Sequence, residues 1–225
     1  MILAIVIHLM LLVGGAFSES FTTSTTPITA PPPTTTQDSC YSCTSPCPTQ
    51  TPSGRYAVPS ALCGDQRLGP TALPSDVLIN SMLENYHQLG RECPQGYFDT
   101  FVNYTGANTY PPQQGFRLYP NGTQIFSRTT IYNNTLIDRF GGYNSTYVSP
   151  VDTPYEQRSI PPSNLVRRGE NASIYYRFLT LRDIEVESGA IAPWYGQPGG
   201  GIQYILPDTT GVLVGNGWLQ DVDSA

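Results

Sequence analysis

Short apolar runs separated by turn-forming residues dominate the chain after residue 97. Pro, Gly and Asn lie between them, and they cover residues 98–102, 116–119, 130–132, 174–179, 202–206 and 211–214. Runs of this length between turn signals are typical of strands. The pattern therefore predicts an α+β fold rich in β structure, with a strongly twisted, mainly antiparallel or mixed sheet and a few short helices at its margins.

A clear helical period precedes this region. Between residues 75 and 90, apolar side chains recur at helical spacing, at Val77, Leu78, Met82, Leu83, Tyr86 and Leu89. Ser75 can cap the first turn, and Gly90 suits the C-terminal end. We therefore expect a helix over 75–90 with Glu84 and His87 on its surface, and a short helix starting within 164–168.

The first 39 residues predict no folded domain. Residues 2–13 are almost wholly apolar and precede small residues at Ala16 and Ser18. This indicates a secretory signal peptide over 1–18 rather than an anchor, because the run is too short to span a bilayer comfortably. Residues 19–39 are mostly Thr, Ser and Pro, as in a disordered or O-glycosylated spacer. We expect a secreted protein, extracellular or at a cell surface, without a stable membrane span.

The cysteines all lie in the first half of the chain: Cys40, Cys43, Cys47, Cys63 and Cys93. In a secreted protein they predict disulfides. We therefore expect a disulfide-bonded N-terminal region over residues 40–104, which contains one helix, and a second domain over residues 105–225. The spacing assigns no connectivity. Because five is odd, either one thiol is free or it pairs between chains in a homodimer.

N-glycosylation acceptors of the form Asn-X-Ser/Thr are frequent between residues 103 and 173. They predict a glycosylated surface and lie at Asn103, Asn121, Asn133, Asn144 and Asn171.

The charge composition excludes several classes of function. The net charge of −6 argues against nucleic acid or an anionic membrane surface as the main partner, because both require a basic face. All 11 basic side chains are arginines, so a Walker-type phosphate loop and a Schiff-base mechanism are excluded. Histidine occurs only at His8 and His87, which excludes a multi-histidine metal site. Without a G-x-S-x-G motif, nothing points to a Ser-His-Asp triad.

Three pieces of residues 138–203 carry side chains suited to a dinucleotide. The first is Asp138-Arg139-Phe140-Gly141-Gly142-Tyr143, followed by Tyr147-Val148-Ser149-Pro150. The second is Thr153-Pro154-Tyr155-Glu156-Gln157-Arg158-Ser159-Ile160-Pro161-Pro162, and the third is Ile191-Ala192-Pro193-Trp194 through Gly199-Gly200-Gly201 to Gln203. Arginines fork hydrogen bonds onto phosphate oxygens, and glycines allow close backbone approach. Aromatic rings can stack on a base or attract a pyridinium ring, and Gln offers both a donor and an acceptor. Each element alone has ordinary structural explanations, whereas the combination is more specific.

This combination resembles the tuberculosis necrotizing toxin domain family, and most closely the secreted fungal NAD glycohydrolases built on that domain. All three pieces match in order and spacing, over residues 105–207. The resemblance implies cleavage of NAD, with NADP left open, to nicotinamide and ADP-ribose. It implies that Arg139 and Gln203 are catalytic, and that the substrate is bound by Phe140, Tyr147, Arg158 and Trp194. Bacterial members use a histidine that this part of the chain lacks.

Two other functions remain open. An ADP-ribosyl cyclase or transferase would use the same substrate, although the paired catalytic glutamates of transferases are missing. A cell-surface glycoprotein with a binding role only would explain the spacer, the glycan acceptors and the cysteines equally well.

The implied hydrolysis requires no cofactor, because nicotinamide leaves as a neutral ring and needs no general acid. A carboxylate could stabilise the oxocarbenium-like sugar, but we expect Asp138, Asp152 and Glu156 to be structural, for instance by pairing with arginines. A calcium site at Asp221 and Asp223 remains an alternative, since calcium prefers oxygen ligands.

Overall fold

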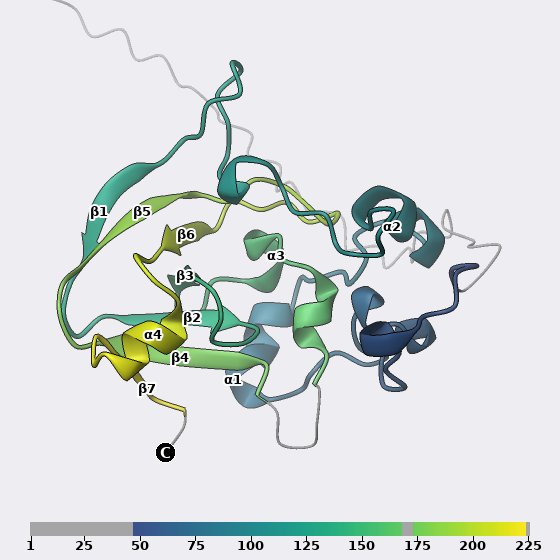
Figure 1. The fold of residues 1–225 in the computed structure, drawn as a ribbon, viewed down its shortest axis with the longest axis horizontal. Coiled ribbons are helices and arrows are strands. Elements are labelled where there is room, and N and C mark those ends of the chain that lie inside the picture. The colour runs from purple at the N-terminus through teal and green to yellow at the C-terminus, as the bar shows by residue number, and fades with distance from the viewer. Residues whose placement is uncertain (1–46, 168–172, 224–225) are drawn as a thin grey trace, which may run out of the picture. The chain divides into compact units, whose positions relative to one another are not determined.

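One antiparallel sheet of seven strands organises the described part of the chain, residues 47–167 and 173–223, in the computed structural model (Figure 1). The strands are β1 (Ser127–Ile131), β2 (Leu136–Phe140), β3 (Tyr147–Pro150), β4 (Tyr175–Thr180), β5 (Ile184–Ala190), β6 (Ile202–Ile205) and β7 (Leu219–Asp221). Their order is β1-β5-β6-β3-β2-β4-β7, and every pairing is antiparallel. This confirms the predicted sheet.

Short helices flank the sheet, as the sequence predicts. The α-helices are α1 (Val77–Asn80), α2 (Pro94–Phe101), α3 (Tyr155–Arg158) and α4 (Thr210–Gly215). Single 3-10 turns are η1 (Gly54–Tyr56), η2 (Leu62–Gly64), η3 (Gln66–Leu68), η4 (Ser81–Leu83), η5 (Gln113–Gly115) and η6 (Pro162–Leu165). The expected helix start within 164–168 differs from the structure, where the 3-10 turn η6 begins at Pro162 and ends at Leu165.

The central strands bury two separate cores, because alternate residues of a strand face opposite sides of the sheet. Phe140 and Tyr175 are partners in the β2–β4 pair, and both pack against helices α1 and α3. Ile137 and Phe178, three residues away, face the other side and share a core with Leu213 of α4. Each face of β2 and β4 is therefore covered by helices.

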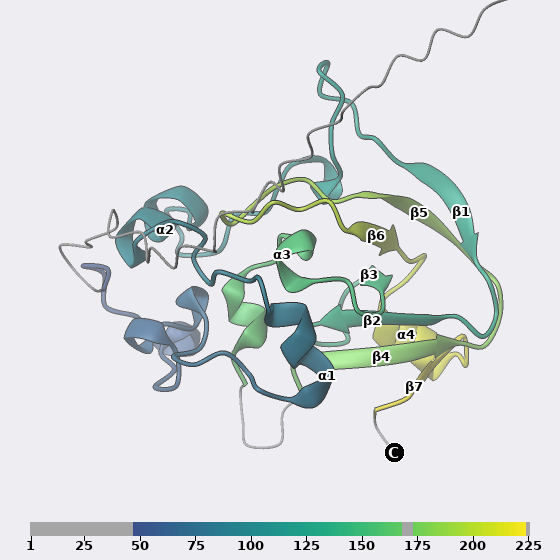
Figure 2. The same ribbon diagram turned by 180° about the vertical axis from the view of Figure 1, so that it is seen from behind.

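The curvature of the sheet places helix α3 close to two of its parts. The β1–β5 pair arches away from β2 and β4, as both views show (Figures 1 and 2). Helix α3 is bonded to β2 through Arg158 and Asp138. It is also bonded to the segment before β6, where the Gly201 N–H donates to the Gln157 carbonyl oxygen at 3.0 Å. Helix α3 thus links strands that are not neighbours in the sheet.

The helix expected over 75–90 is shorter than predicted. Helix α1 and turn η4 cover residues 77–83, and Asp76, not Ser75, precedes them without a side-chain cap. Beyond η4 the chain is no longer helical, and the Gln88 amide donates to the carbonyl oxygens of Leu68 and Pro70, at 2.6 and 2.9 Å. The predicted apolar face is buried at Met82, Leu83 and Tyr86, whereas Val77 and Leu78 are exposed.

Two predicted strands are helices. Residues 98–101 belong to α2, which begins at Pro94, a favourable first position, and buries apolar side chains at helical spacing. Residues 211–214 belong to α4, whose N-terminus is capped by the Thr209 hydroxyl. A short apolar run does not distinguish a strand from a buried helical turn, which explains both errors.

The remaining runs divide between strands and bridges. Those at 130–132, 174–179 and 202–206 correspond to β1, β4 and β6, whereas 116–119 makes only isolated bridges. Strands β2, β3, β5 and β7 were not among the predicted runs.

A disulfide joins Cys47 to Cys63, which confirms that the N-terminal region is disulfide-bonded. Cys93 is disulfide-bonded as well. Cys40, Cys43, the predicted signal peptide, the spacer and Asn171 lie outside the described residues. The other glycan acceptors are exposed: Asn103, Asn121, Asn133 and Asn144.

The proposed domain boundary between 104 and 105 stays a prediction, and residues from both sides share one core. Met82 and Tyr86 pack in the same cluster as Phe140 and Tyr155. No helix among residues 47–167 and 173–223 is long and apolar enough to cross a membrane.

Candidate active site

A cavity of about 570 Å³ opens between the sheet and the segment formed by α3 and η6. Its walls come from the central strands β2, β3 and β6, from residues 158–161 and Asn164, from the loop at 110–115 and from the loop at 141–145. A cavity of this size is in the range of small-molecule sites.

The strand register brings polar side chains from three strands to the cavity. Asp138 of β2 is opposite Ser149 of β3, and Val148 is opposite Tyr204 of β6. Because side chains alternate along a strand, Asp138, Ser149 and Gln203 share one face of the sheet. All three line the cavity, although they are far apart in sequence.

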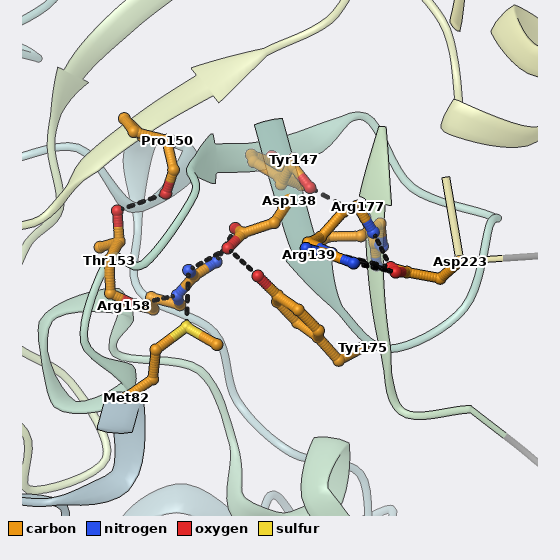
Figure 3. A network of polar contacts seen from close by, with 10 residues as sticks. All are labelled: Met82, Asp138, Arg139, Tyr147, Pro150, Thr153, Arg158, Tyr175, Arg177 and Asp223. Carbon is orange, nitrogen blue, oxygen red and sulfur yellow. Dashed lines mark hydrogen bonds and ion pairs between the residues drawn. The ribbon is translucent and has the colours of Figure 1, made fainter. Parts of the chain in front are cut away.

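Arg139 enters the cavity where the pairing of β2 with β3 ends. Its Nη1 donates to the Tyr147 carbonyl oxygen at 2.9 Å (Figure 3). Its buried Nε has no hydrogen-bond partner, and Arg139 is in none of the ion pairs formed within residues 47–167 and 173–223. Burial lowers the pKa of Arg139 to about 10, so the group is charged at neutral pH without a compensating anion. This arrangement favours an anionic ligand.

Gly141, directly after β2, is favoured by its backbone conformation. Its φ is 96°, which side chains rarely adopt, whereas a Cβ there would lie 3.4 Å from Arg139 Nη2, an ordinary contact distance. The glycine therefore serves the turn after β2 and is not required to make room for the guanidinium.

Arg158 has the opposite environment. Its Nη1 and Nη2 contact Asp138 Oδ1 and Oδ2 at 2.5 and 2.8 Å, and its Nε donates to the Thr153 carbonyl oxygen at 2.8 Å (Figure 3). Nη2 also contacts Met82 Sδ at 3.7 Å. Both charged groups are buried, which confirms that Asp138 pairs with an arginine. Only one N–H, on Nη1, is left for a ligand, so the role of Arg158 in substrate binding stays a prediction.

The Asp138 carboxylate is held by a third group. The Tyr175 hydroxyl donates to Oδ2 at 2.7 Å. Burial raises the pKa of the Asp138 carboxyl, and the hydrogen bonds from Arg158 and Tyr175 act in the opposite direction. Burial and the neighbouring carboxylate both raise the pKa of Tyr175, which keeps its hydroxyl protonated as the donor.

Phe140 and Tyr147 contribute to the cavity in different ways. The Phe140 ring is 3% exposed and packs against Tyr155 and Tyr175, at centroid distances of 4.8 and 4.9 Å. It forms a floor that offers a ligand little surface. Tyr147 is 40% exposed and lines the cavity, so its ring is available for stacking.

Gln203 faces the cavity from β6, as expected. Its Nε2 donates to the Gln114 carbonyl oxygen at 2.9 Å, which fixes the amide plane. The bond is possible because Gln113 and Gln114 adopt left-handed backbone conformations, with φ of 52° and 58°. With its donor side held by the protein, Gln203 can present its acceptor Oε1 to a ligand.

Two aromatic residues that the sequence suggested for stacking lie elsewhere. Trp194 does not line the cavity: its Nε1 donates to the Thr109 carbonyl oxygen at 2.9 Å, and its ring packs edge-on against Phe101 of α2. Tyr143 packs against Tyr176 and bonds Asp221 through its hydroxyl. Both rings are used in packing within the protein, and the contact of Trp194 with substrate stays a prediction.

The triple glycine, residues 199–201, packs closely against other segments of the protein and does not face the cavity. A Cβ on Gly199 would lie 2.7 Å from the Ala192 carbonyl oxygen, and one on Gly201 would lie 2.9 Å from the Gln157 carbonyl oxygen. The glycines therefore let this segment pack closely beside α3 and lead into β6.

The acidic C-terminal residues are engaged within the protein. Asp223 forms an ion pair with Arg177 at 2.6 Å, and Asp221 Oδ1 accepts the Asp223 N–H at 2.8 Å. Within the described residues no three His, Cys, Asp or Glu side chains gather as a metal site would require. The calcium site considered for these two residues gains no support from these contacts.

Several cavity residues could not be recognised from the sequence. Tyr110, Gln114 and Asn164 lie outside the three pieces singled out in the sequence. Ser149 and Ser159 lie within those pieces, where the motifs assign a role to neither. The strand register and the left-handed turns bring these residues together.

Comparison with known proteins defines the class. The family model of the tuberculosis necrotizing toxin matches residues 130–222, which include β2, α3 and β6. The conidial surface nicotinamide adenine dinucleotide glycohydrolase nadA of Aspergillus fumigatus is 35% identical over 168 residues, covering 73% of this chain and 72% of that protein. The chain belongs to the tuberculosis necrotizing toxin domain family, as the sequence motifs predicted.

Two solved structures are similar over about half of the chain. The tuberculosis necrotizing toxin complexed with its immunity factor is 22% identical with a TM-score of 0.39, covering 53% of this chain and 65% of that one. The Rhs1-CT structure with its cognate immunity protein is 12% identical with a TM-score of 0.33, covering 51% of this chain and 85% of that one.

Proposed function

We propose that this protein is an NAD glycohydrolase that acts outside the cytoplasm, in the extracellular space or at a cell surface. It breaks the bond between nicotinamide and ribose with water, releasing nicotinamide, ADP-ribose and a proton. The observation that carries this proposal is the 35% identity, over 73% of the chain, to a conidial surface NAD glycohydrolase. The charge distribution of the cavity supports it independently.

Arg139 provides the site for the pyrophosphate. It is a partly buried cation without an ionic partner in the described protein, and it lines the cavity. A dinucleotide places two negative charges there, and charge-assisted hydrogen bonds to a desolvated arginine are among the stronger polar contacts.

Gln203 and Tyr147 act at the nicotinamide end. The leaving ring carries a positive charge until the bond breaks, so the face of Tyr147 attracts it while it is bound. Positive charge then develops on the sugar, and the Gln203 Oε1 dipole can stabilise it. Nicotinamide departs as a neutral ring and the electron pair of the bond goes with it, so the step needs no general acid and no cofactor.

Product analysis tests the proposal against its two rivals. Purified protein incubated with NAD should yield nicotinamide and ADP-ribose in equal amounts. A cyclic product would indicate a cyclase, and ADP-ribose attached to protein would indicate a transferase. Absence of turnover at high protein concentration would favour a glycoprotein that only binds. The same assay with NADP measures whether a 2′-phosphate is accepted.

A further inference from the structure

Ser159 combines a strained backbone with a position in the cavity wall. It follows Arg158 at the C-terminal end of α3, with φ of 47° and ψ of 40°, in the left-handed region. Residues with a Cβ rarely adopt this conformation, and glycine adopts it at lower cost. The side chain is 3% exposed and lines the cavity.

Contacts on both sides hold Ser159 in this conformation. Before it, Arg158 is fixed by Asp138 and by the Thr153 carbonyl oxygen. After it, Ile160 precedes Pro161, and a residue before proline is disfavoured in the helical region. The Tyr155 hydroxyl also donates to the Pro161 carbonyl oxygen at 2.8 Å. Strain that is over-determined in this way is typical of functional sites.

The Ser159 hydroxyl is buried and unsatisfied. No group within residues 47–167 and 173–223 forms a hydrogen bond with its Oγ. Buried hydroxyls nearly always have a partner, and an exception in a cavity wall is explained most simply by a ligand group. Strain and an unpaired hydroxyl are two independent observations at one residue.

We propose that the Ser159 hydroxyl hydrogen-bonds a hydroxyl of the ribose that carries the scissile bond, an assignment that rests on the proposed function. Next to Ser159, the charge of Arg158 is neutralised by Asp138, so a phosphate gains little there. The uncompensated cation is Arg139, which takes the pyrophosphate. A neutral sugar hydroxyl, which both donates and accepts, matches a serine hydroxyl that is free to do both.

The geometry also connects this position with Gln203. The carbonyl oxygen of Gln157, two residues before Ser159, accepts the N–H of Gly201, two residues before Gln203. Both side chains line the same cavity. Ser159 and Gln203 thus provide two neutral polar groups for the sugar, on elements that are bonded to each other.

Two substitutions separate the hydroxyl from the strain. Ser159→Ala removes the hydroxyl and keeps the Cβ, while Ser159→Gly removes both. We expect kcat/KM for NAD to fall by about 10-fold in each variant, with a melting temperature for Ser159→Gly at or above that of the wild type. The control is Ser163→Ala, whose hydroxyl accepts from Asn108 outside the cavity wall and whose loss leaves kcat/KM unchanged.

NAD analogues lacking either the 2′- or the 3′-hydroxyl of the nicotinamide ribose test the assignment itself. With one of these analogues, kcat/KM should be the same for Ser159→Ala and for the wild type, because the partner hydroxyl is already absent. An undiminished 10-fold loss with both analogues would overturn the ribose assignment, as would full activity of Ser159→Ala on NAD. If the wild type cleaves no NAD, the proposed function fails instead, so the two failures are distinguishable.

Discussion

Arg158 and Asp138 form a two-point ion pair beneath the cavity, with N···O distances of 2.5 and 2.8 Å and almost no exposure of either side chain. One residue from Asp138, Arg139 has no such partner among the described residues. The two arginines that the sequence offered for substrate binding are therefore in different electrostatic states. Arg158 is neutralised by Asp138 in the protein interior, and Arg139 is available for an anion.

Arg158→Ala should destabilise the protein strongly. The substitution leaves the Asp138 carboxylate buried without its counter-ion, which costs about 3–5 kcal/mol. Chemical denaturation measures the free energy of unfolding. The matched control is Arg177→Ala, because the Arg177–Asp223 pair is partly exposed and should contribute about 1 kcal/mol or less. Equal losses in the two variants would contradict the difference in burial.

Arg139→Ala should reduce activity and preserve the fold. It removes a charged donor of the pyrophosphate, and kcat/KM for NAD should fall by about 100-fold. Because this guanidinium is desolvated without a counter-ion, the free energy of unfolding should stay constant or rise. Steady-state kinetics and denaturation on the same sample measure both. Arg139→Lys keeps the charge and should recover part of the activity; no loss in either variant would refute the phosphate contact.

Gln203→Ala should act mainly on kcat. Loss of a fixed dipole that stabilises transition-state charge typically costs about 100- to 1,000-fold. Gln197→Ala is a suitable control, since Gln197 is also buried but its Nε2 donates to the His87 carbonyl oxygen at 2.7 Å, outside the cavity. That variant should lose stability and keep kcat. If Gln203→Ala retains kcat while KM rises, the residue binds substrate without acting in the chemical step.

The pH dependence of kcat/KM should follow the charge of Arg139. Burial lowers its pKa to about 10, so the protonated, phosphate-binding form predominates below that value and is lost as the pH rises through it. After subtraction of spontaneous NAD breakdown, we expect Arg139 to cause no change in kcat/KM between pH 6 and pH 8. The value of kcat/KM should then decline near pH 10. Because kcat/KM reports groups of the free enzyme, a decline centred near pH 7 would show that another group controls binding.

The sequence predicts the family and several of the cavity residues because these residues lie in continuous motifs. Arg139, Arg158 and Gln203 all line the cavity, and the antiparallel sheet agrees with the pattern of short apolar runs. Trp194 lies outside the lining of this cavity, because a motif gives no direction for its side chains. Here the ring is anchored to the Thr109 carbonyl oxygen and faces α2.

Other features depend on contacts between distant segments. Residues 98–101 and 211–214 are helical because of packing and capping that their short apolar runs do not encode. The cavity position of Gln114 requires two successive left-handed residues, and that of Ser159 requires clamping by Asp138 and Pro161. None of these is a property of a local sequence window.

NAD hydrolysis at the Gln203 site is tested most directly by a time course of NAD cleavage with the purified wild-type protein and with Gln203→Ala. Nicotinamide and ADP-ribose are both quantified by chromatography. We expect a 1:1 ratio of the two products with the wild type, and at least about a 100-fold slower release with the folded variant. Equal rates for the two proteins, or no ADP-ribose from the wild type, would contradict this expectation.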